Sequence, residues 1–129
     1  MKNLKIKENQ SIYNAMKMLQ KTAEGCLIVV DAKNTFKGTL TDGDIRRYIL
    51  KGNNINGNIK LAFKKQPTFF NINNLNFSKI AKILNKNNLP LIPIVNDQNK
   101  VVDYYNRKRL INKKVEQRAR KRLNVDVVI

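Results

Sequence analysis

Residues 25–31 read GCLIVVD, and residues 90–96 read PLIPIVN. Both are short apolar runs that end in a polar residue, which is the pattern of a buried strand followed by a turn. Val29 and Val30 in the first run match Ile94 and Val95 in the second, 65 residues further along the chain. This offset organises the rest of the sequence.

The same offset holds upstream and downstream of the two runs without a gap. Apolar residues upstream have the i, i+3, i+4, i+7 spacing of one helix face. The matched positions are Ile12, Ala15, Met16 and Leu19 in the first copy, and Phe77, Ile80, Ala81 and Leu84 in the second. The chain of 129 residues is therefore predicted to be an internal duplication.

Each copy is predicted to fold as β-α-β-β-α, which gives an α/β fold of the α+β kind. The expected lead-in strands are 4–7 and 68–72, the first helices 11–22 and 76–87, the apolar strands 26–30 and 91–95, and the second helices 42–51 and 107–113. Ser11 and Asn76 are the expected N-caps of the first helices. The first repeat is assigned to residues 1–54 and the second to 55–113. A unit of this size has little core of its own, so the helix faces are expected to pack across a pseudo-twofold axis and leave a cleft.

The composition is strongly basic, with 26 Lys and Arg against 9 Asp and Glu and a formal charge of +17. Such a surface attracts phosphates and nucleic acids. Compositional drift is the favoured explanation, because Lys, Asn and Ile are all heavily used, while anionic small ligands and nucleic acid stay open. No apolar run approaches the roughly 20 residues that span a bilayer. A single cysteine and no histidine indicate a cytoplasmic chain with no disulfide, no metal site and no catalytic residues.

Residues 38–47, GTLTDGDIRR, carry the most informative motif. Thr41 is expected to start a helix after a strand, with Asp44 three residues on. Free amides at a helix N-terminus suit a phosphate, and an aspartate can accept hydrogen bonds from ribose hydroxyls. Gly38 allows a ligand or another backbone segment to approach closely. The alternative is a capping box, in which Thr41 and Asp44 satisfy each other's backbone amides.

This motif, inside a repeated β-α-β-β-α unit, resembles the CBS domain, and Gly38, Thr41 and Asp44 match it residue by residue. The resemblance implies a tandem CBS pair that binds an adenosine nucleotide, AMP or ATP, in its central cleft and forms a homodimer. It also implies that the start of the first apolar strand, Gly25, Cys26 and Leu27, lines the base pocket.

The second repeat departs from the motif. Asp103, Asn106 and Arg109 stand 65 residues after Gly38, Thr41 and Asp44. A cation has replaced the ribose-binding carboxylate, so this second site is predicted to be degenerate or remade for phosphate. One nucleotide per chain is expected.

Residues 114–129 are expected to be a basic linker followed by a β-branched run, 124–129. That run resembles the first strand of sugar-phosphate nucleotidyltransferases, and CBS pairs with a similar motif precede such enzymes. The leading hypothesis is a non-enzymatic regulatory module of an attached or partner nucleotidyltransferase, in a chain that stops at a domain boundary. A structural dimerisation module and a basic nucleic-acid-binding protein are the alternatives.

Overall fold

The computed structural model describes residues 2–128, and it describes side chains for all of these except 117 and 121–128. The first repeat contains β1 (Lys5–Lys7), α1 (Ile12–Thr22), β2 (Cys26–Val30), β3 (Phe36–Thr41) and α2 (Asp42–Leu50). The second contains β4 (Phe70–Asn71), α3 (Phe77–Lys86), β5 (Ile92–Val95), β6 (Val101–Tyr105) and α4 (Arg107–Val128). Short 3₁₀ turns at Ile59–Leu61 and Ile72–Asn74 lie in and after the connector. The β-α-β-β-α order is confirmed in both repeats.

The two sheets repeat each other down to their irregularities. Their strand orders are β1-β2-β3 and β4-β5-β6, with the first pair parallel and the second antiparallel in each sheet. A register shift falls between Val29 and Val30 in one sheet and between Ile94 and Val95 in the other. Left-handed residues also recur at the same offset, Ala23 with Asn88 and Asn34 with Asn99. The duplication is therefore a property of the backbone as well as of the apolar pattern.

A pseudo-twofold axis passes between the two turns that follow β2 and β5. The equivalent residues Thr35 and Lys100 pair with each other in an antiparallel bridge, as a twofold axis requires. Asn34 Nδ2 donates to the Val101 carbonyl, and Asn99 Nδ2 donates to the Phe36 carbonyl, each at 3.4 Å. These reciprocal hydrogen bonds join the two repeats at the axis.

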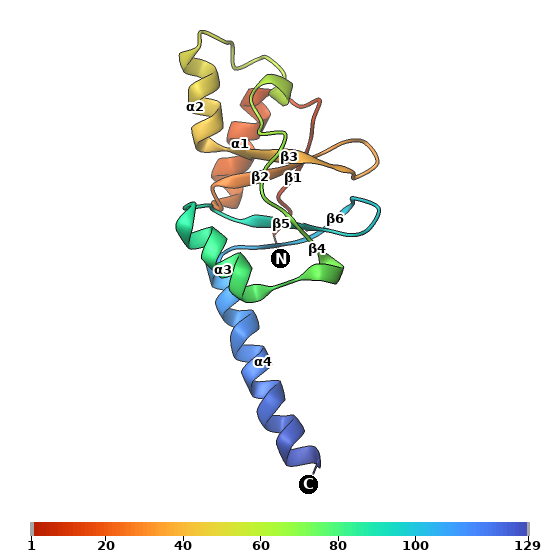
Figure 1. Cartoon of the computed structure of the whole chain (residues 1–129). Helices are drawn as coiled ribbons and strands as arrows, with labels where there is room; N and C mark the ends of the chain where they lie inside the picture. The colour runs from red at the N-terminus through yellow and green to blue at the C-terminus, as the bar shows by residue number, and fades with distance from the viewer. Residues whose placement is uncertain (1, 129) are drawn as a thin grey trace.

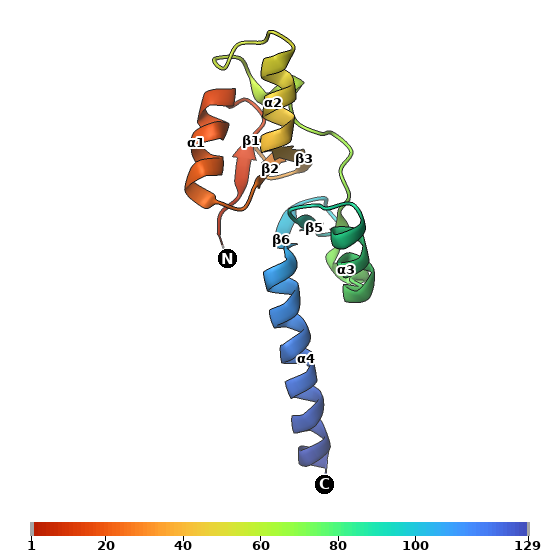
Figure 2. The same cartoon turned by 90° about the vertical axis from the view of Figure 1, so that its left-hand side faces the viewer.

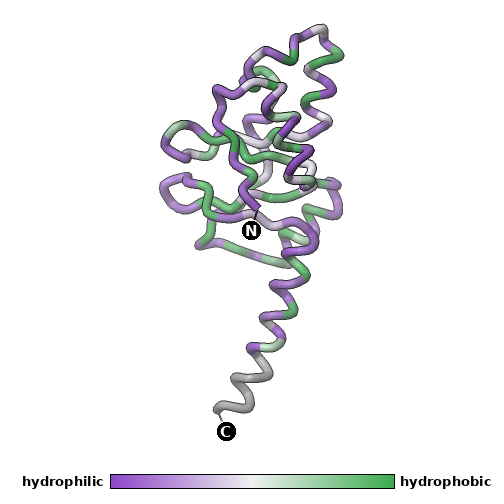
Figure 3. Tube along the Cα trace, turned by 180° about the vertical axis from the view of Figure 1, so that it is seen from behind, coloured by the Kyte–Doolittle hydropathy of each residue, from purple (hydrophilic) through white to green (hydrophobic). Residues whose placement is uncertain are grey.

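The sheets lie face to face in the middle of the molecule, with the helices outside them (Figure 1). Figure 3 shows hydrophobic segments gathered along the strands where the repeats meet. The buried cluster between the sheets contains residues of both repeats: Leu4, Cys26, Ile28, Val30, Phe36, Leu91, Val95, Val101 and Tyr104. The prediction that helix faces pack across the axis is wrong. The apolar stripes of α1 and α3 pack on their own sheets instead, in two separate clusters.

The reason lies in the alternation of strand side chains. All five residues of β2 are buried, and successive side chains point to opposite faces. Leu27 and Val29 contact the helices of their own repeat, while Cys26, Ile28 and Val30 face the second sheet. A strand apolar on both faces supports a three-layer arrangement of helices, paired sheets and helices.

Both predicted N-caps are confirmed. The Ser11 hydroxyl accepts from the Asn14 amide at 3.1 Å, and the Asn76 side chain accepts from the Lys79 amide at 3.0 Å. Each cap satisfies one of the free amides of its first turn, which fixes where α1 and α3 begin.

The C-terminal segment differs from its prediction. Helix α4 continues past residue 113 to Val128, so residues 124–128 are helical where a strand was expected; residue 129 lies outside the described residues. A strand needs a neighbouring strand for its backbone hydrogen bonds, whereas a helix satisfies them within itself. Figure 2 shows α4 extending away from the body of the molecule. None of the described helices is long and apolar enough to cross a membrane.

Candidate functional site

A cavity of about 570 Å³ lies between the repeats beside the Thr41–Asp44 motif. The first repeat contributes the end of β3 and the start of α2, and the second contributes its lead-in and the junction between α3 and β5. The lining residues are Cys26, Thr39, Thr41, Gly43, Asp44, Arg47, Lys64, Pro67, Thr68, Asn87, Asn88, Leu89, Pro90 and Leu91. A ligand in this cavity would contact both repeats at once.

Thr41 and Asp44 form the capping box that the sequence left open as an alternative. The Thr41 hydroxyl accepts from the Asp44 amide at 3.2 Å, and Asp44 Oδ2 accepts from the Thr41 amide at 2.9 Å. The motif therefore has a structural role at the N-terminus of α2. The same two side chains line the cavity, so the capping role does not remove them from it.

Charged groups surround the motif at the cavity wall. Arg47 Nη2 donates to the other carboxylate oxygen, Asp44 Oδ1, at 2.5 Å. Lys64 lies on the connector side of the same cavity. One carboxylate beside two cations and a helix N-terminus suits a ligand that carries both hydroxyl donors and a phosphate.

Gly38 lies beside another segment of the backbone. A β-carbon on it would lie 2.0 Å from the Lys64 carbonyl oxygen. Thr39 and Lys64 exchange two backbone hydrogen bonds at this crossing, of 3.0 and 2.8 Å. Gly38 therefore lets the connector cross β3, and that crossing helps to place Lys64, Pro67 and Thr68 on the cavity wall.

The predicted base-pocket residues Gly25, Cys26 and Leu27 are only partly brought to this cavity. Cys26 lines it, but Leu27 is fully buried in the core of the first repeat. A β-carbon on Gly25 would meet Pro90 at 3.8 Å, so Gly25 packs against the wall rather than forming it. The residues that line the cavity at the equivalent place are 87–91 of the second repeat.

The cause of this difference is the pseudo-twofold axis. It places the strand start of each repeat opposite the helix N-terminus of the other. The 65-residue offset maps 25–27 onto 90–92, so the sequence contained the signal, and a crossed pairing of the repeats would have found residues 87–91. Lys64, Pro67 and Thr68 carried no such signal.

The second-repeat positions are occupied by contacts within the protein. Arg109 Nη1 pairs with the Asp103 carboxylate and donates to the Tyr104 carbonyl. Burial alone would lower the pKa of Arg109, but the Asp103 hydrogen bond and charge outweigh it and raise the pKa above its ordinary value. Asn106 caps α4 and also donates to Glu24 of the first repeat at 2.7 Å. These contacts are consistent with the predicted degenerate site.

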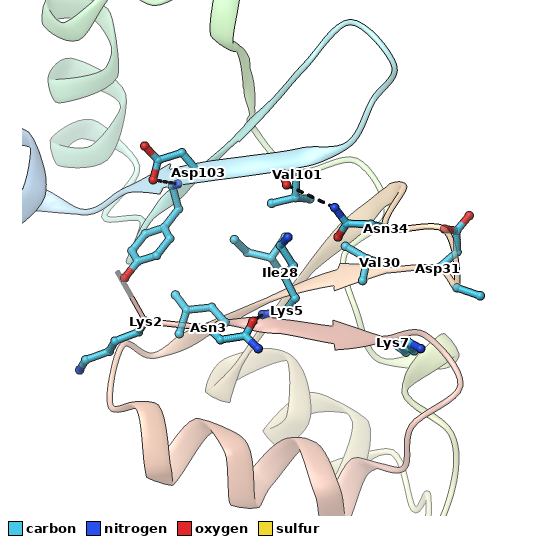
Figure 4. Close-up of a pocket in the computed structure, with 13 residues that line it drawn as sticks. Lys2, Asn3, Lys5, Lys7, Ile28, Val30, Asp31, Asn34, Val101 and Asp103 are labelled. Atoms are coloured by element: carbon cyan, nitrogen blue, oxygen red, sulfur yellow. Dashed lines mark hydrogen bonds between the residues drawn. The ribbon is translucent and has the colours of Figure 1, made fainter.

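A second cavity, of about 510 Å³, lies between the β1 edge of the first sheet and β6 of the second (Figure 4). Lys2, Lys5 and Lys7 line one side, Asp103 lies on the other, and the floor includes Ile28 and Val30. No carboxylate occupies the position equivalent to Asp44 here, because Arg109 stands there. The two clefts of the pair are thus chemically different.

Burial raises the pKa of the Cys26 thiol to about 12, and the nearby Asp44 carboxylate adds to the shift. The side chain is buried, so at about pH 8 roughly one thiol in ten thousand is ionised. We expect thiol reagents to label the folded chain at least about a hundredfold more slowly than the denatured chain. Absorbance on reaction with an aromatic disulfide measures this. Equal rates in the two states would contradict the burial of Cys26.

The fold and the inter-repeat cleft define a tandem pair of β-α-β-β-α modules, which is the fold of a CBS pair. Residues 1–51 match the CBS domain family, and this match lies on the repeat that carries Thr41 and Asp44. Two uncharacterised proteins from Helicobacter pylori strains J99 and 26695 are 31% and 30% identical over 98 residues, covering 75% of this chain and 30% of each relative. The chain thus spans about a third of the length of these curated relatives.

Solved structures with the same fold cover most of the chain. CBSX2 in complex with AMP, a protein of Arabidopsis thaliana, has a TM-score of 0.72 at 17% identity, covering 88% of this chain and 87% of that one. A chain described as a signal-transduction protein with CBS domains, from Burkholderia ambifaria, has a TM-score of 0.72 at 15% identity, covering 89% and 84%. The cytosolic domain of the Mg²⁺ channel MgtE in complex with ATP has a TM-score of 0.68 at 13% identity, covering 84% and 44%. These neighbours agree with the prediction that this chain is not an enzyme.

Proposed function

We propose that the chain is a regulatory module that binds one adenosine nucleotide, AMP or ATP, in the cleft at Thr41 and Asp44. The observation that carries the proposal is the position of this motif on the wall of a cavity shared by both repeats, beside Arg47 and Lys64. AMP in CBSX2 and ATP in MgtE support the choice of ligand, since both proteins share the fold.

Each lining group has a role in this proposal. Asp44 accepts the ribose hydroxyls, and the Thr41 hydroxyl and the first-turn amides of α2 lie near the phosphate. Arg47 and Lys64 supply positive charge for the phosphate. Leu89, Pro90 and Leu91 offer an apolar wall for the base on the side of the second repeat.

Regulation follows from the way this site is shared. A ligand that contacts both repeats favours one relative arrangement of them by its difference in affinity for the two arrangements. Helix α4 begins two residues after β6 ends, so a shift of the second repeat moves whatever α4 leads to. We propose an attached or partner sugar-phosphate nucleotidyltransferase as that target, on the resemblance of residues 114–129 and of the motif.

Isothermal titration calorimetry of the chain with AMP, ADP and ATP tests the site. We expect saturable binding of at least one of them at one nucleotide per chain, because Arg109 stands where the second carboxylate would be. No binding of any of the three would reject the proposal. Two equivalent sites per chain would reject its one-sided form.

Two further assignments follow from the CBS resemblance and the cysteine. We propose a cytoplasmic homodimer, paired through outer helix faces that expose Tyr13, Met16 and Leu50. Sedimentation at the 14.9 kDa monomer mass would contradict the dimer. The +17 charge favours nucleic acid as a second candidate partner. That function requires an affinity that falls steeply with salt, and retained affinity at high salt would reject it.

A further inference from the structure

The Asp44 carboxylate is fully engaged in the empty cleft. Its Oδ2 accepts from the Thr41 amide at 2.9 Å, and its Oδ1 accepts from Arg47 Nη2 at 2.5 Å. The first contact belongs to the capping box and holds the start of α2. A ribose hydroxyl therefore has to compete with Arg47 for Oδ1.

The Arg47 contact is the weaker of the two. Its side chain is 67% exposed, and exposed ion pairs at i, i+3 on a helix add little stability. The guanidinium also has space on two sides. Arg47 lines the main cavity and a smaller hollow of about 100 Å³ beside Tyr48 and Leu61, and Asp44 lines both as well.

Gly43 supports this arrangement. A β-carbon on Gly43 would lie 3.5 Å from Arg47 Nη1, so the guanidinium lies across the first turn of α2. The first-turn amides are where the proposed function puts the phosphate. When Arg47 leaves Asp44 it is already next to that place and can pair with a phosphate by charge-assisted hydrogen bonds.

We propose that Arg47 is a latch on Asp44 that makes the cleft select phosphorylated nucleosides over free nucleosides. This inference rests on the proposed function. A nucleoside that displaces Arg47 from Oδ1 breaks an ion pair and returns nothing to the guanidinium. A nucleotide breaks the same ion pair and gives Arg47 a phosphate partner. The selectivity therefore arises from one side chain with two alternative anions.

Calorimetry with adenosine and AMP on an Arg47→Ala variant tests the latch. We expect adenosine affinity to rise about two- to fivefold, which is the strength of an exposed ion pair. We expect AMP affinity to fall at least about tenfold, because a charge-assisted contact is lost. The opposite signs distinguish the latch from a general loss of positive charge.

Arg46→Ala is the matched control. Arg46 is the adjacent residue on α2, is exposed, and does not line the cavity, so the variant removes the same charge without touching Asp44. We expect its ratio of AMP to adenosine affinity to equal that of the unmodified chain. An unchanged ratio in Arg47→Ala would overturn the latch while leaving the proposed function in place. If the unmodified chain binds neither AMP, ADP nor ATP, the proposed function fails and the latch fails with it.

Discussion

Replacing Gly38 with alanine is expected to lower the free energy of unfolding by about 3 kcal/mol or more. The new β-carbon would lie 2.0 Å from the Lys64 carbonyl oxygen and 2.7 Å from the ring of Phe63. A backbone oxygen at that distance cannot rotate away, so either β3 or the connector has to move. Movement breaks the two hydrogen bonds between Thr39 and Lys64 and disturbs the buried ring of Phe63.

Urea or thermal denaturation followed by circular dichroism measures this effect, with a midpoint about 10 °C lower for the variant. Gly43→Ala is the matched control, because it makes the same chemical change in the same motif. A β-carbon there meets only side-chain atoms, the nearest of them Arg47 Nη1 at 3.5 Å. Alanine is a better helix former than glycine by about 1 kcal/mol, so this control should be neutral or slightly stabilising. A loss of similar size in both variants would contradict the role assigned to the crossing at Gly38.

The repeat, the strands and the caps could be predicted from sequence because their causes are local. Residues 25–31 and 90–96 show apolar runs with polar ends, and Ser11 and Asn76 stand where a first turn needs acceptors. Asp31 and Asn96 fix the following turns in the same way, each accepting from the amides two and four residues on. None of these contacts depends on how the two repeats are placed.

The predictions that failed depend on that placement. A strand such as β2, apolar at every position, gives no sign of which face meets a helix and which meets a second sheet. The base wall was assigned to the wrong repeat for the same reason, since Leu27 and Leu91 are equivalent in sequence but only Leu91 lines the cavity. Gly38 was correctly singled out for close approach, but its neighbour, the Lys64 carbonyl, is fixed by the path of the connector.

Replacing Asp44 with alanine is expected to lower nucleotide affinity at least about tenfold and up to about a hundredfold, the range for hydrogen bonds to a charged acceptor. The carboxylate lines the cavity and is the acceptor for ribose hydroxyls in the proposed function. Calorimetry with the nucleotide that binds the unmodified chain measures the loss. Asp42→Ala is the matched control, because Asp42 lies in the same first turn of α2, is exposed, and does not line the cavity. Its affinity should change less than about twofold, since an exposed charge at this distance is largely screened.

The capping role of Asp44 has to be separated from its ligand role. Alanine removes the acceptor for the Thr41 amide, so this variant should also lose about 1 kcal/mol of stability. Asp44→Asn keeps an oxygen for that amide and removes the charge, so it should fold with nearly normal stability and still bind weakly. Nucleotide at a hundred times its dissociation constant should stabilise the unmodified chain by about 2.7 kcal/mol, and should not stabilise either Asp44 variant at the same concentration. If Asp44→Ala lowers stability while no nucleotide stabilises the unmodified chain, Asp44 is a capping residue alone and the pair is a structural module.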